Sequence, residues 1–444
     1  MRWTIPFILS CCSAAATAAP GTVTVEMTTL QSMARTPVGA TIKLDEFPAG
    51  PGILTEITFE RIDVYAAGAR IVEIGPNGER ELPRSANVQL IGTSPDRSTR
   101  VSLTLEPRRG EVVYGSGSGP SGTFVVRSRR SASGWTLSAI DVDASHPPGV
   151  VPEFAANVDT AFGPDTDSHP LAHLAGSEAL AASTPARLAV VAVDTDNELM
   201  SLRFSNNTTL ATDWIAILFT SINVFYRSDL DVILLQGTTF LRTAPDPYNN
   251  LNTPASEAQL IEFGNYWQNN HAAVPRAFAM LLSGKSSSGN SASGIAWLDR
   301  YCQTLGTFGS YSVNQVFTNP GIGAASNAFL VGHELGHNFG ALHTHCANAT
   351  TGAGNTNTNT IDQCFNGESP RGCYGGAPSC PSSGPGAPKG TLMSYCHTNA
   401  PAGANCTSNV LQFHPTHVTQ LRNRIAANTP SCLKSETIFT NGFQ

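Results

Sequence analysis

Apolar and polar side chains alternate with a period of two in the first third of the chain. Residues 55–59 and 101–105 follow this alternation, which is typical of strands with one buried face. The turn sequence Pro-Asn-Gly at 76–78 lies between two apolar segments, which predicts a β-hairpin. We therefore expect residues 19–150 to form a β-rich N-terminal domain, an antiparallel sandwich or barrel.

Beyond residue 187, apolar runs of strand length alternate with amphipathic segments of helical period, which predicts an α/β layer. One of the helical segments is apolar enough to resemble a membrane span, but polar residues interrupt it and favour a buried core helix. The expected strands are 188–193, 230–235, 277–282 and 295–298, and the expected helices are 210–226 and 256–267.

Residues 151–186 differ from the segments on either side. Prolines interrupt them repeatedly, and residues 179–183 contain only Ala, Leu and Ser. This composition predicts a linker, which would suit a processing region. The last residues, 433–444, are expected to form a C-terminal tail beyond a domain at 187–432.

The composition narrows the class of protein. A chain of 444 residues suits two or three domains with a large core. Charged residues make up only 13%, and with 40 Gly and 29 Pro this composition argues against both a coiled coil and disorder. The net charge of −7 shows no basic excess, so no nucleic-acid partner is expected.

The N-terminus has the pattern of a secretory signal peptide over residues 1–18. Arg2 precedes an apolar run at 5–9, and Ala16-Thr17-Ala18 is a suitable cleavage site. A lipoprotein signal ending at Cys12 is a weaker alternative, because the residue before it is not Gly or Ala. We expect a secreted, extracellular protein that does not associate with the membrane once the signal is removed.

The cysteines are distributed unevenly. Two of the ten lie in the signal segment, and the other eight lie between Cys302 and Cys432. In an oxidising compartment these eight suit four disulfides, whose pairing stays open.

The chemistry is concentrated in His333-Glu334-Leu335-Gly336-His337, followed by Gly340 and His343. On a helix, His333 and His337 lie one turn apart on one face, so both imidazoles can bind one ion. Glu334 lies about 100° further round, beside the ion. Gly340 permits a left-handed turn that ends the helix and lets His343 return as the third ligand. Three His ligands that leave one position for water predict a single catalytic Zn²⁺.

Downstream, Gly390-Thr391-Leu392-Met393-Ser394-Tyr395-Cys396 places a Met in a tight turn. The histidine motif followed by this Met-turn resembles the metzincin zinc endopeptidases, and residues 187–432 are most similar to the reprolysin (adamalysin-type) catalytic domain. The resemblance implies an α+β (α/β-type) domain with a mixed sheet and a zinc-binding active-site helix, preceded here by the β-rich domain. Thr344 departs from the Asp usual in reprolysins, and the Met393-x-Tyr395 spacing matches astacins and serralysins.

The resemblance also implies a function: a secreted zinc metalloendopeptidase that hydrolyses peptide bonds in proteins through a zinc-activated water, with Glu334 as general base. Met393 would form an apolar floor beneath the histidines. Tyr395 is either an oxyanion support or a packed turn residue. The substrate would pair with an edge strand, for which the candidate is Gly294, Ile295 and Ala296; the alternative is an ordinary core strand.

Several alternatives stay open. A catalytically silent metzincin-fold adhesion or binding module is the main one, although all four motif residues are present. A hydrolase of non-protein substrates is another. His345 as a fourth ligand of a structural zinc site is disfavoured, and His397, His414 and His417 are expected to be structural or exposed. Calcium is common in similar proteases, but no loop here has the ligand spacing.

The N-terminal domain has the position of a propeptide in a zymogen. A cysteine switch is excluded because no Cys lies between the signal and Cys302. Asp165, Asp167 or His169 in the linker would be available to block the zinc, and assistance in folding is an equal alternative. We expect a monomer that acts on proteins and peptides.

Overall fold

A computed structural model describes residues 21–108, 110–131, 134–154, 160–161, 186–354, 358–384, 387–407 and 409–435. The expected signal peptide, most of the linker with Asp165, Asp167 and His169, and residues 436–444 lie outside the described residues.

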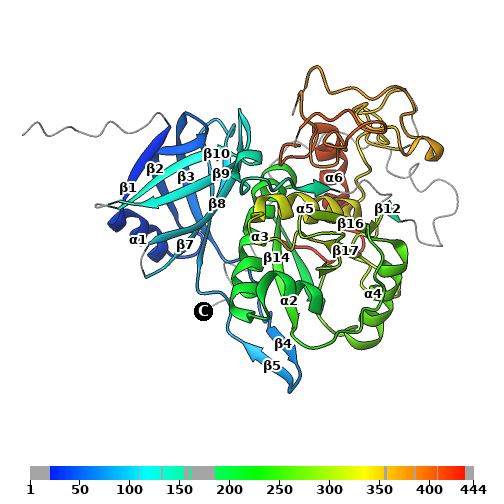
Figure 1. Ribbon diagram of the computed structural model, residues 1–444, viewed down its shortest axis with the longest axis horizontal. Coiled ribbons are helices and arrows are strands. Elements are labelled where there is room, and N and C mark those ends of the chain that lie inside the picture. Colours follow the sequence, from blue (N-terminus) through cyan, green and yellow to red (C-terminus); the bar gives the residue numbers. More distant parts are fainter. Residues whose placement is uncertain are drawn as a thin grey trace, which may run out of the picture.

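Eight antiparallel strands form the N-terminal sheet, in the order β1-β10-β9-β8-β7-β6-β3-β2. The sheet curls so that β2 contacts β10 and β1, which gives it a barrel-like form (Figure 1). Phe47, Phe59 and Phe124 fill its interior and are fully buried. The expected β-rich domain is therefore confirmed. Its strands are β1 (Thr22–Glu26), β2 (Thr41–Gly50), β3 (Ile53–Ile62), β6 (Val88–Thr93), β7 (Arg100–Glu106), β8 (Glu111–Gly119), β9 (Gly122–Arg130) and β10 (Gly134–Asp141).

The predicted hairpin at 76–78 forms between β4 (Ile71–Gly75) and β5 (Gly78–Leu82). It does not belong to the barrel. β4 pairs in parallel with β14 (Val232–Arg242), so the hairpin extends the second sheet, and Figure 1 shows it at the bottom of the view, below β14 and α2 (Asn197–Phe204).

The second sheet is mixed and has the order β11-β16-β17-β15-β13-β14-β4-β5. Its central strands are parallel, and β16 runs antiparallel to β17. The predicted strands are present, although the second begins at Val232 rather than 230 because Leu230 still belongs to a helix. Its other strands are β11 (Glu153–Phe154), β12 (Thr160–Ala161), β13 (Arg187–Thr195), β15 (Phe278–Ser283), β16 (Ser291–Trp297), β17 (Tyr311–Gln315) and β18 (Lys434–Ser435).

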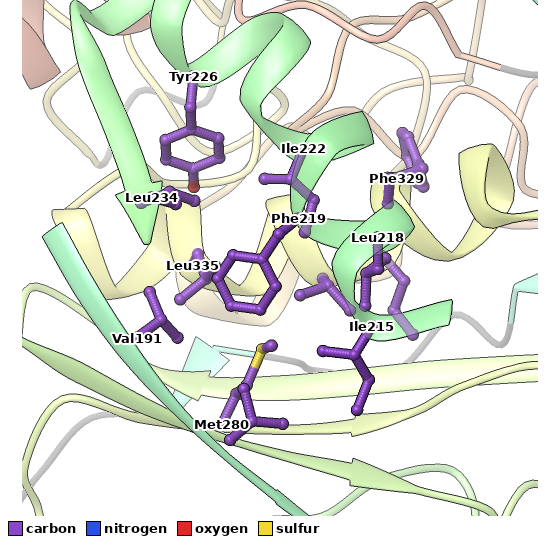
Figure 2. Close-up of a cluster of buried hydrophobic side chains, with 14 of the residues drawn as sticks. Val191, Ile215, Leu218, Phe219, Ile222, Tyr226, Leu234, Met280, Phe329 and Leu335 are labelled. Carbon is purple, nitrogen blue, oxygen red and sulfur yellow. The ribbon is translucent and has the colours of Figure 1, made fainter. Parts of the chain in front are cut away.

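Helices cover both faces of this sheet. Successive residues of a strand point to opposite faces, so Val191 packs against Phe219 and Leu335 on one face, as Figure 2 shows, while Ala192 belongs to the cluster around Trp267 on the other. The mixed α/β architecture expected for this part of the chain is confirmed. The helices are α1 (Met27–Arg35) beside the barrel, then α2 (Asn197–Phe204), α3 (Thr208–Leu230), α4 (Glu257–Asn270), α5 (Ala324–Phe339) and α6 (Pro415–Ala427).

The apolar helix α3 lies between the barrel and the second sheet. It contacts β6, β7 and β8 on one side and β14 and α5 on the other. By length and composition it would be able to cross a membrane, but 78% of its apolar window is buried within the molecule. Burial on both sides explains why it is apolar almost all round.

Candidate metal centre

Helix α5 carries His333, Glu334 and His337. It ends at Gly340, whose φ of +109° lies in the left-handed region that favours glycine. The amide of Ala341 then donates to the carbonyl of Gly336, which closes the helix end. The chain reverses there and returns His343 to the helix.

The three predicted ligands come together. The ligand atoms of His333, His337 and His343 all lie within 4.8 Å of one another, and all three side chains are buried. The Nε2 atoms of His333 and His337 are 3.0 Å apart.

The hydrogen bonds of the rings fit a metal ion. The Nδ1 atoms of His333 and His337 lie 2.8 and 2.7 Å from the carbonyl oxygens of Leu392 and Ala341. A carbonyl only accepts, so each Nδ1 carries the proton and each Nε2 keeps its lone pair. The two Nε2 lone pairs therefore point to one buried position, where they could bind a cation. Neutral imidazole is a common ligand of zinc.

Glu334 lies against the strand β16. A Cβ atom added at Gly294 would be 2.2 Å from Oε1 of Glu334, so only glycine leaves room for this carboxylate. Both residues line a small cavity together with His333 and Tyr395.

The Met-turn packs directly beneath α5. Met393 is fully buried, and a Cβ atom added at Gly336 would lie 2.8 Å from its Sδ. Thr344, the departure from the reprolysin pattern, donates from its amide to the carbonyl of Met393 at 3.0 Å. Ser394 in the turn donates to Asp362 Oδ2 at 2.7 Å, a contact that the sequence did not predict.

The Tyr395 ring packs on the histidines. Its centroid is 4.5 Å from that of His343 and 6.0 Å from that of His333, and the residue is 5% exposed. The turn therefore places its side chain beside the ligands, as a role in catalysis or in packing would both require.

The candidate substrate strand, with Gly294, Ile295 and Ala296, lies within β16. One edge of β16 pairs with β17. The other edge pairs in parallel with β11, at Phe154 opposite Ala292, and with β12, at Thr160 opposite Ala296. Residues that precede the peptidase domain in the chain thus occupy this edge.

Glu368 is a further residue of the centre, and the sequence did not predict it. Its Oε2 lies 2.5 Å from Nδ1 of His343 and 2.7 Å from Nε2 of His345. Burial alone would raise the pKa of Glu368, but attraction and hydrogen bonding to the two histidines outweigh it and lower the pKa. It follows His343 by 25 residues in a loop without a motif, so no spacing rule points to it.

His345 belongs to this same cluster. Its ring stacks on that of His343 at 5.1 Å, and its Nε2 is bound to Glu368. The neighbouring Cys346 forms a disulfide with Cys373 and is therefore not a thiolate ligand.

Three other histidines singled out in the sequence, His397, His414 and His417, are also in the described part of the chain. His397 packs edge-on against Phe154 and Phe329. His414 accepts from the amide of Thr416 at the start of α6, and His417 on α6 is fully buried.

The eight cysteines after residue 300 form four disulfides, as expected. Three of these disulfides cross-link the segment that runs from His343 past the Met-turn. The pairs are Cys302–Cys432, Cys346–Cys373, Cys364–Cys396 and Cys380–Cys406.

Comparison with known proteins identifies a family and shows likenesses to solved structures. The family model Reprolysin_5, described as metallo-peptidase family M12, matches residues 184–409, slightly more than half of the chain. Among solved structures, the crystal structure of metalloproteinase-II from Bacteroides fragilis is 12% identical, with a TM-score of 0.35. That match covers 69% of this chain and 82% of the other. No curated protein matches the chain in sequence.

Proposed function

The chain belongs to metallopeptidase family M12, and from this we propose that it is a secreted zinc endopeptidase that cleaves proteins with Glu334 as general base. One observation carries the proposal: three buried histidines have their ligand atoms within 4.8 Å of one another, and the adjacent Glu334 lines a small cavity together with one of them, His333. A silent binding module would have no need of that carboxylate.

A zinc ion held by His333, His337 and His343 would supply a Lewis acid for the scissile carbonyl and for water. The chain's own residues do the rest. The Glu334 carboxylate accepts a proton from the attacking water and then delivers it to the leaving amine. The Tyr395 hydroxyl would donate to the oxygen on which negative charge develops, a role supported by Tyr395 lining the same cavity as Glu334.

The variant Glu334→Gln tests the catalytic assignment. Gln has the same size but cannot take up the proton, so the rate of casein cleavage should fall by about 10²- to 10⁴-fold. Zinc content, measured by elemental analysis, should stay at one ion per chain. Cleavage at the wild-type rate would show that Glu334 is not the base. A protein that binds zinc and cleaves nothing, both as the full chain and after proteolytic removal of the residues before 187, would favour the binding module.

Secretion is part of the proposal. The signal pattern at 1–18 and the four disulfides, which persist in oxidising compartments, support it. Sequencing the N-terminus of protein from the culture medium should give a start at Ala19. A start at Met1 in the cell fraction alone would contradict secretion.

We also propose that the N-terminal region holds the peptidase latent, as in a zymogen. Extended substrates bind by adding a strand to an exposed sheet edge, and β11 and β12 already pair with that edge of β16. Phe154 of β11 lines the same small cavity as His333 and Glu334. Together with Phe329 it also lines a second cavity, of about 680 Å³.

The variant Phe154→Ala tests latency in the full chain. Phe154 packs edge-on against Phe317, Phe329 and His397. Without these contacts β11 should leave the edge more often, so peptidase activity should rise several-fold. Val151→Ala is the control, because Val151 is 77% exposed. Unchanged activity in Phe154→Ala would favour a role of this region in folding instead.

A further inference from the structure

One ligand differs from the other two in its partner. The Nδ1 atoms of His333 and His337 face backbone carbonyls, whereas Nδ1 of His343 faces a carboxylate, Oε2 of Glu368. We propose that Glu368 is a positioning residue, which fixes the ring orientation and tautomer of His343 and thereby sets the zinc affinity. This inference rests on the proposed zinc site.

The hydrogen bond decides which nitrogen of His343 faces the ion. A carboxylate accepts, so Nδ1 must carry the proton and Nε2 keeps its lone pair for the metal. Both partners are buried, with 1% and 3% of their side chains exposed, so water competes little for the bond. A charged acceptor also makes the imidazole a stronger ligand than a carbonyl does.

His343 needs such support more than the other ligands do. His333 and His337 are held one turn apart by the backbone of α5. His343 lies beyond the Gly340 turn, in a segment without regular secondary structure. Only its side-chain contacts can therefore fix the direction of its ring.

Glu368 is itself held firmly. His345 shares the same oxygen at 2.7 Å, and Arg371 lies 4.0 Å from Oε1 while it donates to the carbonyl of Thr160. The disulfide Cys346–Cys373 ties the loop of Glu368 to the segment that carries both histidines. This arrangement assigns His345 the role of an anchor for Glu368.

The test is the variant Glu368→Gln in the full chain, with the zinc dissociation constant as the readout, measured by competition with a chelating indicator. Gln keeps the size and an acceptor oxygen but removes the charge. Loss of an outer carboxylate partner typically weakens metal binding by about 10- to 100-fold, and we expect a loss in this range. The visible spectrum of the cobalt-loaded variant should also change, because the orientation of one ligand changes.

A matched control separates this effect from a general loss of stability. Asp194→Asn also neutralises a buried carboxylate, which pairs with Arg242 at 2.8 Å in the sheet. It should lower Tm but leave the zinc affinity unchanged. Zinc affinity that is unchanged in Glu368→Gln, or lowered equally in both variants, would overturn the proposal.

A variant that fails to fold and a wild-type protein that binds no zinc lead to different conclusions. If Glu368→Gln does not fold, His345→Leu decides, because it removes one anchor of Glu368 and leaves no unpaired polar group. It should weaken zinc binding by a few-fold, and an unchanged affinity would count against the proposal. If the wild-type protein binds no zinc at all, the proposed function fails instead.

Discussion

At the scale of single residues, His417 gives the clearest dependence on pH. It is fully buried on α6, and neither of its ring nitrogens has a hydrogen-bond partner among the described residues. Burial, followed by repulsion from His414 and the three ligand histidines, lowers its pKa from 6.5 to about 3. The folded protein therefore holds His417 neutral where the unfolded chain would protonate it.

The sign follows from this difference. As the pH falls below about 6.5, the unfolded chain takes up a proton that the folded chain does not, so the free energy of unfolding falls. At pH 5 the loss should be about 2 kcal/mol relative to pH 8. His417→Leu should remove this share of the loss. Urea unfolding at both pH values, with chelator present throughout, measures it. An equal loss in the variant and the wild type would contradict the assignment to His417.

Tyr395 either supports the oxyanion or only packs in the turn, and one substitution distinguishes these two roles. Its ring packs 4.5 Å from that of His343 and lines the cavity with Glu334. Tyr395→Phe keeps the packing and removes the hydroxyl. If the hydroxyl supports the oxyanion, kcat should fall by about 10²-fold with little change in KM or zinc content. We expect this result; a kcat within about twofold of wild type would leave Tyr395 as a packed turn residue.

At the scale of elements, the approach of β16 to α5 depends on one glycine. A Cβ atom on Gly294 would lie 2.2 Å from Oε1 and 2.5 Å from Cδ of Glu334. Gly294→Ala should therefore displace the carboxylate by about 1 Å and lower kcat by about 10²-fold, while zinc stays bound. Gly289→Ala, just before β16, is the control, because the nearest atom to its Cβ would be Oγ1 of Thr318 at 3.3 Å, a much milder contact that does not involve Glu334. Similar kinetics in both variants would show that the approach is not tight.

Element prediction succeeded where the period was strong and local. The alternation at 101–105 and the Pro-Asn-Gly turn each correspond to a strand pair, and the three histidines named from their spacing lie around one point. The strand β17, Tyr-Ser-Val-Asn-Gln, was not predicted, because its polar residues outnumber its aliphatic ones. They are tolerated because the structure satisfies them, as when Gln315 accepts from Ser293.

The residues of the candidate metal centre also fall into a group that the sequence predicted and a group that it did not. Residues on one helix are related by a fixed angle, so His333, Glu334 and His337 follow from spacing. Glu368 and Asp362 come from a long loop whose path depends on disulfides. Because cysteine pairing cannot be derived from a single sequence, neither carboxylate was predictable.

At the scale of the whole molecule, the barrel and the peptidase sheet are interleaved. The β4–β5 hairpin leaves the barrel to pair with β14 (Figure 1). Buried polar contacts also join the two parts. Gln89 Oε1 accepts from Thr104 within the barrel at 2.6 Å and from Thr220 of α3 at 2.9 Å. The sequence pattern did not predict these contacts between the two parts, because it indicates only the local strand or helix that each segment forms. We infer that the two parts unfold together.

An ion pair between the parts tests that inference. Arg100 of β7 pairs with Asp229 near the end of α3, where Asp229 is 6% exposed. Asp229 Oδ2 also accepts from the amide of Phe413, whose ring packs on Tyr226 of α3. Arg100→Met would leave a buried charge without its partner. The cost should be about 3 kcal/mol, at the low end for a buried pair because Arg100 is 22% exposed.

The double variant Arg100→Met/Asp229→Asn should regain much of this loss, since Asn is neutral and still accepts from Phe413. Lys43→Gln is the control, because its pair with Glu56 is exposed on the barrel, where water screens the attraction, and should contribute little to stability. Urea unfolding should be followed by far-ultraviolet circular dichroism for the whole chain and by casein cleavage for the peptidase. In Arg100→Met both transitions should shift together, because the pair links the barrel to α3, and α3 in turn packs against the active-site helix α5. A shift confined to one probe, or no larger than that of Lys43→Gln, would show that the two parts are stable independently.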